Sequence, residues 1–218
     1  INDETGDRTI ATTGEINLVY GEDKIIEELL GLSFEISMKS FFQTNPKSAE
    51  KLYSKVIDYA LEKKDTVDNN IVLDLFCGTG TIGQILASKS ENAQIVGVDI
   101  IEEAIENAKE NAERNNIEGV KFYAADVGKF LYEHPQYKNK LRTIILDPTR
   151  AGVAPKTMQK IIDLGAERMV YVSCNPATQA RDIDLLAQAG YHITKFSLVD
   201  QFPHTAHVES VVLLEKTV

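Results

Sequence analysis

The sequence predicts an α/β fold: a seven-stranded, mostly parallel sheet with helices on both faces, an antiparallel last strand and a small β-rich N-terminal appendage. From residue 47 onward, short apolar runs alternate with segments of helical periodicity. The apolar runs are hydrophobic almost throughout, which is typical of strands covered on both faces. Residues 8–20, by contrast, are rich in Thr and β-branched side chains.

Each element is justified by its own pattern, in chain order. Residues 8–20 are expected to form short strands or a hairpin, and another strand is expected near 32–36. In residues 47–63 the apolar side chains recur on one helical face. We expect helices over 47–63, 80–88, 102–115, 155–164 and 177–189. We expect the seven strands over 71–76, 94–99, 120–124, 143–147, 169–173, 193–199 and 208–215.

Composition excludes several classes of protein. Hydrophobic residues are 43% and charged residues 26%, the mix of an ordinary globular domain. The most apolar stretch, 71–87, is broken by Asp74 and by glycines, so we expect no membrane span. Two cysteines are too few for a disulfide framework or for a structural metal site, so we expect no metal and a reducing, cytoplasmic setting.

Charge and the first residues bear on partners. The net charge is −10, which argues against a chain that clamps nucleic acid by itself, since such proteins are usually basic. The chain opens Ile1-Asn2-Asp3-Glu4, without an initiator Met or a signal peptide. We interpret this start as a fragment boundary.

A glycine-rich turn follows the first long strand. Residues 74–83, Asp-Leu-Phe-Cys-Gly-Thr-Gly-Thr-Ile-Gly, contain G-x-G-x-x-G and open a helix. Gly78 and Gly80 would let the backbone approach a ligand closely. Asp99 ends the next strand, where a carboxylate can bind both ribose hydroxyls of an adenosine, and Asp126 follows the third strand near the expected adenine edge.

This pattern predicts a nucleoside site but leaves the nucleoside open. A dinucleotide and S-adenosylmethionine both fit the turn. Asp74 lies inside the strand just before the glycines. A carboxylate there suits the cationic methionine end of S-adenosylmethionine, whereas a pyrophosphate needs amide donors at the helix start. We therefore favour S-adenosylmethionine.

A second candidate site surrounds Cys174, which follows the fifth strand and precedes a helix. A thiol at a helix N-terminus is expected to be stabilised as the nucleophilic thiolate. A simply packed cysteine is the commoner case, but Asp147 and Arg150 end the neighbouring strand, and Glu209 lies where the last strand begins. Gln43 precedes the first helix and is placed to fold over a cofactor.

Five motifs in this order resemble the RNA (uracil-5-)-methyltransferase family, whose members use S-adenosylmethionine to make 5-methyluridine in tRNA or ribosomal RNA. The motifs span residues 42–209. They are Phe42-Gln43-x-Asn45, Asp74-x-Phe76-Cys77-Gly78-x-Gly80, Asp147-Pro148-x-Arg150-Ala151-Gly152, Ser173-Cys174-Asn175-Pro176-x-Thr178 and Phe202-Pro203-His204-Thr205-x-His207-Val208-Glu209. Thr149 departs from the family, which usually has a second proline there, and this is expected to loosen the turn.

The resemblance implies a class I methyltransferase fold over 41–218 and the remnant of a β-rich, RNA-facing domain over 1–40. It implies that Cys174 is the nucleophile and Glu209 the base, with Asp147 and Arg150 supporting them. Cofactor binding is implied for Gln43, Phe76, Asp99 and Asp147, beside the residues of the glycine turn. The partner is structured RNA rather than DNA or a membrane, and the family's N-terminal RNA-binding domain is not in this sequence.

Two other functions remain open from the sequence. An NAD-dependent oxidoreductase on the same glycine turn would leave Cys174 and Glu209 without a role. A non-catalytic, RNA-associated module would keep the fold without the reaction.

Overall fold

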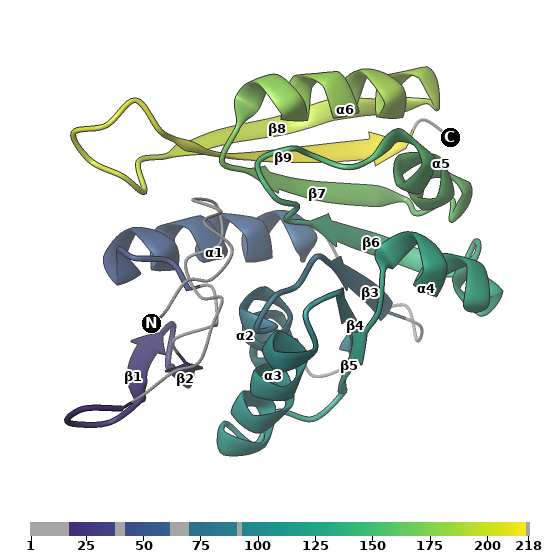
Figure 1. Ribbon diagram of the computed structural model, residues 1–218. Helices are drawn as coiled ribbons and strands as arrows, with labels where there is room; N and C mark the ends of the chain where they lie inside the picture. Colours follow the sequence, from purple (N-terminus) through teal and green to yellow (C-terminus); the bar gives the residue numbers. More distant parts are fainter. Residues whose placement is uncertain (1–17, 38–41, 62–69, 91–92, 217–218) are drawn as a thin grey trace.

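The computed structural model describes residues 18–37, 42–61, 70–90 and 93–216. Within these residues a seven-stranded sheet forms the centre of the molecule, with helices on both faces (Figure 1). The strand order is β5-β4-β3-β6-β7-β9-β8; β9 pairs antiparallel with β7 and β8, and the other pairs in this sheet are parallel. The predicted sheet and its antiparallel last strand are therefore confirmed. The strands are β3 (Asn70–Leu75), β4 (Ala93–Asp99), β5 (Val120–Ala124), β6 (Leu141–Leu146), β7 (Arg168–Ser173), β8 (Tyr191–Val199) and β9 (Glu209–Lys216).

Six α-helices are present in the described ranges. They are α1 (Pro46–Ala60), α2 (Thr81–Lys89), α3 (Glu102–Arg114), α4 (Val127–Glu133), α5 (Pro155–Asp163) and α6 (Pro176–Gln188), with a short 3₁₀ turn at Pro135–Tyr137. The short helix α4 was not predicted. Its few apolar positions, including Phe130 and Leu131, pack with α5 and the sheet, so tertiary burial defines it more than periodicity does.

Strand residues alternate between two hydrophobic cores, one on each face of the sheet. Val72, Ile145 and Val211 pack with α1 and α2 in one core. Their chain neighbours Leu73 and Val212 pack with α4, α5 and α6 in the other. Because successive side chains of a strand point to opposite faces, sequence parity tells which face each site residue occupies.

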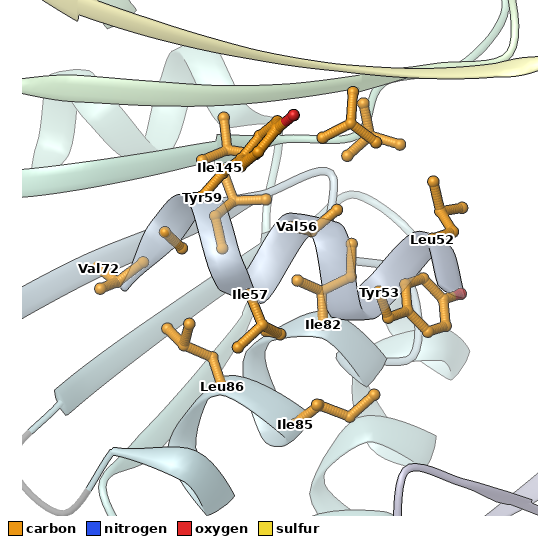
Figure 2. Packing of buried hydrophobic residues seen from close by; sticks show 14 of the residues in the cluster. Leu52, Tyr53, Val56, Ile57, Tyr59, Val72, Ile82, Ile85, Leu86 and Ile145 are labelled. Carbon is orange, nitrogen blue, oxygen red and sulfur yellow. The ribbon is translucent and has the colours of Figure 1, made fainter. Parts of the chain in front are cut away.

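The core between α1, α2 and the sheet orients α1. Figure 2 shows apolar side chains of α1 beside those of α2. They include Leu52, Val56 and Ile57 from α1, and Ile82, Ile85 and Leu86 from α2. Asn45 caps the start of α1 by accepting a hydrogen bond from Ser48 N, and Pro46 occupies the first turn. The start of α1 is thereby defined, three residues after Gln43.

A two-stranded antiparallel hairpin, β1 (Lys24–Leu29) and β2 (Leu32–Ser37), is attached to α3 by two asparagines. Asn111 accepts from Glu35 N at 2.7 Å and donates to Glu35 O at 3.1 Å. Asn115 makes the same two bonds with Ser33, both at 2.8 Å. The spacing of four residues along α3 thus matches the spacing of two residues along β2. The two side-chain amides pair with the edge of β2 as the backbone of another strand would.

The N-terminal predictions fare unevenly. The strand near 32–36 is confirmed as β2, whereas β1 was not predicted. Most of the predicted hairpin at 8–20 lies outside the described residues, as does the proposed domain boundary at residue 40. The observed β1–β2 hairpin contributes Leu29 and Phe34 to the core under α1. The division into domains 1–40 and 41–218 stays a prediction. No helix in the described ranges is long and apolar enough to cross a bilayer.

Candidate functional site

Four chemically active side chains line up across adjacent strands β3, β6, β7 and β9. Asp74 lies in β3, Asp147 directly follows β6, Cys174 directly follows β7, and Glu209 begins β9. Each lies two residues from a strand residue that packs in the α1 core, so parity places all four on the α1 face. The pairing of Ser173 with Ser210 brings Cys174 opposite Glu209.

The three carboxyl groups of this row influence one another. Glu209 is only 3% exposed, and burial raises its pKa to about 7. Burial also raises the pKa of Asp147 well above its usual value, with further contributions from the charges of Glu209 and Asp74. Like charges gathered in one place resist simultaneous ionisation, so the row favours a cationic ligand.

The thiol of Cys174 is half-buried beside these carboxyls. Burial raises its pKa, the charges of Glu209 and Asp147 raise it further, and only the Arg150 guanidinium among the contributing side chains lowers it. The expectation of a thiolate stabilised by the helix N-terminus is therefore wrong for the free chain. Cys174 precedes the N-cap Asn175, and burial beside two carboxyl groups raises the pKa of its thiol.

The glycine turn between β3 and α2 adopts left-handed backbone at three positions, Phe76, Gly78 and Gly80. At Gly80 a Cβ would lie 2.5 Å from the Phe122 ring, so glycine is required there for both space and conformation. At Gly78, no atom of the described residues beyond its chain neighbours lies within 4 Å of the position that a Cβ would take. The space beside the Gly78 backbone is thus open, and its proposed role in ligand binding stays a prediction.

Asp99 and Asp126 lie beyond neighbouring strand ends. Asp99 accepts hydrogen bonds from Gly78 N and Ile101 N, both at 2.9 Å, which ties the end of β4 to the glycine turn. Each carboxylate oxygen retains a second acceptor position for a ribose hydroxyl. Asp126 caps α4 through Lys129 N at 2.8 Å and is exposed. Its proposed contact with adenine stays a prediction.

Buried acceptors without a hydrogen-bond partner among the described residues include one atom each of Asp74 and Gln43. Asp74 Oδ2 accepts from Gly83 N at 3.0 Å, but Oδ1 of this fully buried carboxyl has no such partner. Gln43, 6% exposed, likewise has an unpaired Oε1. Unpaired buried acceptors require a donor, and an ammonium or a hydroxyl supplies one. These residues fit the methionine end of S-adenosylmethionine.

The same contacts disfavour a dinucleotide. A pyrophosphate binds free amide donors at the start of the helix. Here the Asp74 carboxylate already takes the Gly83 N–H in the first turn of α2, and its charge would repel the phosphates. Within the described ranges, no three His, Cys, Asp or Glu side chains gather as a metal site.

Tyr53 and Gln201 were not identified as site residues from the sequence. Tyr53, on the buried side of α1, lies close enough to the row for the charges of Asp147, Glu209 and Asp74 to raise its pKa, after burial. Gln201, 1% exposed, donates from Nε2 to Asn45 O at 3.2 Å and so ties the segment before Glu209 to the start of α1. A buried Tyr hydroxyl needs a polar neighbour, and that rule could have singled out Tyr53.

Replacing Asp74 by asparagine is expected to stabilise the fold while weakening cofactor binding. Burial raises the folded-state pKa of Asp74 to about 7, above its ordinary 3.8. The carboxyl therefore stabilises the fold most below its ordinary pKa, and this contribution is lost as pH rises through about 7. At pH about 8 we expect D74N to gain about 2–4 kcal/mol of unfolding free energy, and less at pH about 6.

Urea denaturation at the two pH values measures this gain, and calorimetry measures the affinity for S-adenosylhomocysteine. The asparagine carbonyl can still accept from Gly83 N, so the turn keeps its bond. Equal stability of the two proteins at the higher pH would show that Asp74 is not a buried, unpaired charge.

The fold and the glycine turn define a class: this chain has the class I methyltransferase fold. It matches the tRNA (uracil-5-)-methyltransferase family over residues 10–217, and it belongs to that family.

Relatives agree with this assignment. An uncharacterized RNA methyltransferase of Clostridium acetobutylicum is 47% identical over 218 residues, which are 100% of this chain and 45% of the relative. Another, from Caldanaerobacter subterraneus, is 44% identical over 216 residues, 99% of this chain and 46% of the relative. The chain thus spans about half the length of the curated relatives it matches.

Among solved structures, the tRNA (uracil-54, C5)-methyltransferase of Pyrococcus abyssi, in complex with S-adenosyl-L-homocysteine, is 35% identical with a TM-score of 0.73. The match covers 89% of this chain and 45% of that one. A methyltransferase of Agrobacterium tumefaciens has a TM-score of 0.69 at 17% identity, over 91% of this chain and 72% of that one, and so shows the fold alone.

Proposed function

We propose that this chain is the catalytic part of an enzyme that transfers a methyl group from S-adenosylmethionine to carbon 5 of a uridine in tRNA or ribosomal RNA. The observation that carries the proposal is the placement of the Cys174 thiol opposite the Glu209 carboxyl and beside Arg150 and Asp147. The reaction needs a nucleophile, a base and a nearby cation, and Cys174, Glu209 and Arg150 offer these groups.

Cofactor binding is assigned to the glycine-turn side of the row. Asp74 and Gln43 offer the unpaired acceptors, and Asp99 offers acceptor positions for ribose hydroxyls. The remaining binding positions are Phe76, Gly78, Gly80, Asp126 and Asp147. When bound, S-adenosylmethionine supplies an electrophilic methyl group and a positive charge. The carboxyl groups of the row are matched to that charge.

Carbon 5 of uracil is too weak a nucleophile to react unaided. We assign Cys174 the first step: its thiol gives its proton to solvent water, and Sγ of the resulting thiolate bonds to carbon 6 of the ring. The electron pair of the 5,6 double bond then makes carbon 5 nucleophilic as part of an enolate. Arg150 is placed to stabilise negative charge on the thiolate or on the enolate oxygen.

Transfer of the methyl group leaves S-adenosylhomocysteine as the second product, and carbon 5 then carries both the methyl and a proton. We assign Glu209 to remove that proton, whose electron pair reforms the double bond as the Cys174 sulfur departs. A carboxyl with a pKa of about 7 is partly ionised at neutral pH and binds the abstracted proton more strongly than an ordinary glutamate would. Asp147 is assigned to hold the reacting groups and the cofactor.

The RNA substrate is expected to present its uridine splayed out of the stack, because the thiol cannot reach carbon 6 in a stacked base. The net charge of −10 provides little attraction for RNA, so affinity is assigned to parts of the protein beyond this chain. We place the reaction in the cytoplasm. The chain alone is expected to bind the cofactor but to methylate RNA poorly.

Calorimetry with the isolated chain tests the cofactor assignment. We expect binding of S-adenosylmethionine and S-adenosylhomocysteine and no binding of NAD. The reaction itself is tested by assaying methyl transfer by the full-length protein to tRNA and to ribosomal RNA in parallel. Binding of NAD alone would support the oxidoreductase alternative, and cofactor binding without methylation of either RNA would support a non-catalytic module.

A further inference from the structure

The connection after β6 is held by side chains of α6. The carbonyl of Arg150 accepts hydrogen bonds from Asn175 Nδ2 at 3.2 Å and from Thr178 Oγ1 at 3.1 Å. The single Thr178 hydroxyl proton is shared with the Asn175 carbonyl, which lies 3.0 Å from Oγ1. The next carbonyl, that of Ala151, accepts from Arg181 Nη2 at 3.0 Å. The backbone that carries the Arg150 side chain is therefore fastened to the helix.

Asp182 lies at the centre of these contacts and is fully buried. Its Oδ2 accepts from Val153 N at 2.7 Å and from the Tyr171 hydroxyl at 2.6 Å. Its Oδ1 accepts from Arg181 Nε at 2.9 Å and Nη2 at 2.7 Å. Four donors satisfy this carboxylate, and each bond to a charged group is stronger than a neutral one.

The connection is shaped to fit this helix. Gly152 has φ of +77°, and a Cβ there would lie 2.5 Å from Asp182 Oδ2 and 2.7 Å from Arg181 Nη2. Gly152 N also donates to Thr149 O at 2.8 Å. This bond closes the turn that begins at Thr149, the position where the family usually has proline. Hydrogen bonds thus hold a turn that was expected to be loose.

The same helix starts immediately after the Cys174 segment, since Asn175 is its N-cap. We propose that Thr178 and Asp182 are positioning residues that hold Arg150 beside the Cys174 thiol. That this positioning serves catalysis rests on the proposed function, whereas the hydrogen bonds that hold the connection do not depend on it.

Thiol reactivity reports on this positioning. The charged groups acting on Cys174 are Glu209 from β9, together with Asp147 and Arg150 from the connection after β6. Arg150 lowers the pKa of the thiol, and the two carboxyls raise it. A connection released from α6 would move the cation away and leave the carboxyls in place.

The test is the rate at which iodoacetamide alkylates Cys174 in the full-length protein as a function of pH, followed by mass spectrometry of the Cys174 peptide. We expect T178V to shift the midpoint of the alkylation rate to a higher pH by at least about half a pH unit, because it removes one bond to the Arg150 carbonyl. D182N should move it in the same direction. Thr178→Val is the decisive variant if Asp182→Asn does not fold.

Two further variants separate positioning from stability. T178S keeps the hydroxyl and should restore the parent profile. T143V removes another threonine hydroxyl, a buried one on β6 that donates to Ala60 O at 3.5 Å, and should leave the profile unchanged whatever its effect on Tm. In an R150Q background, itself shifted upward, T178V should add no further shift.

An unchanged profile in T178V, or a full additional shift in the R150Q background, would overturn the positioning role. Alkylation requires neither cofactor nor RNA, so this outcome is independent of the proposed reaction. Failure of the parent protein to methylate RNA would overturn the proposed function while leaving the positioning result to stand.

Discussion

Replacing Cys174 by alanine is expected to abolish both the covalent bond to RNA and methyl transfer. Without the sulfur, carbon 5 of uracil has no route to the enolate, so the rate should fall by at least about a thousandfold. The thiol is half-buried at a strand end, and its loss leaves a small gap, so the fold should persist. Transfer of a radioactive methyl group into RNA measures the rate.

Cys77 supplies the matched control. Its thiol packs against the small core beside α3, and burial raises its pKa well above the ordinary value. C77A should therefore still form the covalent bond to RNA. Methylation by C174A at the parent rate would remove the nucleophile from the mechanism, and loss of the adduct in C77A alone would transfer that role to the other cysteine.

Replacing Glu209 by glutamine is expected to trap the enzyme on its RNA. The amide can no longer accept the carbon 5 proton, so turnover should slow by about 10²–10⁴-fold while the methylated Cys174–uracil adduct accumulates. The variant keeps the shape of a side chain that is 3% exposed, so the strand should form normally. Denaturing gel electrophoresis detects the accumulated adduct.

The pH dependence of proton removal follows from the pKa of Glu209. Because burial raises that pKa to about 7, the parent's release step should slow as pH falls below about 7, when the carboxyl is protonated. Glu215, on the same face at the far end of β9, is the control: E215Q should release RNA as the parent does. Rapid turnover without an adduct in E209Q would assign the base elsewhere.

Sequence patterns sufficed for the sheet, because apolar strands and amphipathic helices alternate regularly from residue 47 onward. The site residues could be proposed for a related reason: strand ends with polar residues meet at one edge of a parallel sheet. The sequence did not show that these residues share one face, because the strands are apolar on both faces. Parity places Asp74, Asp147 and Glu209 together only once the structure shows Val72, Ile145 and Val211 packing under α1.

Features that depend on tertiary contact could not be predicted. The bonds from Thr178 and Asp182 to the connection after β6 join segments about 30 residues apart, and no local pattern encodes them. The thiol of Cys174 was misjudged because its helix-end position is visible in the sequence, whereas burial beside Glu209 is not. The short helix α4 depends likewise on packing, and the strand β1, whose side chains are mostly exposed, depends on its pairing with β2.

The most direct test is to incubate the full-length protein with S-adenosylmethionine and RNA containing 5-fluorouridine, and to map the cross-linked peptide by mass spectrometry. Fluorine cannot be removed as a proton, so the reaction should stop after methyl transfer. We predict one modified peptide, carrying the methylated nucleotide on Cys174. A nucleotide attached to another residue, or methylation of ordinary RNA by a protein that never forms this adduct, would contradict the account.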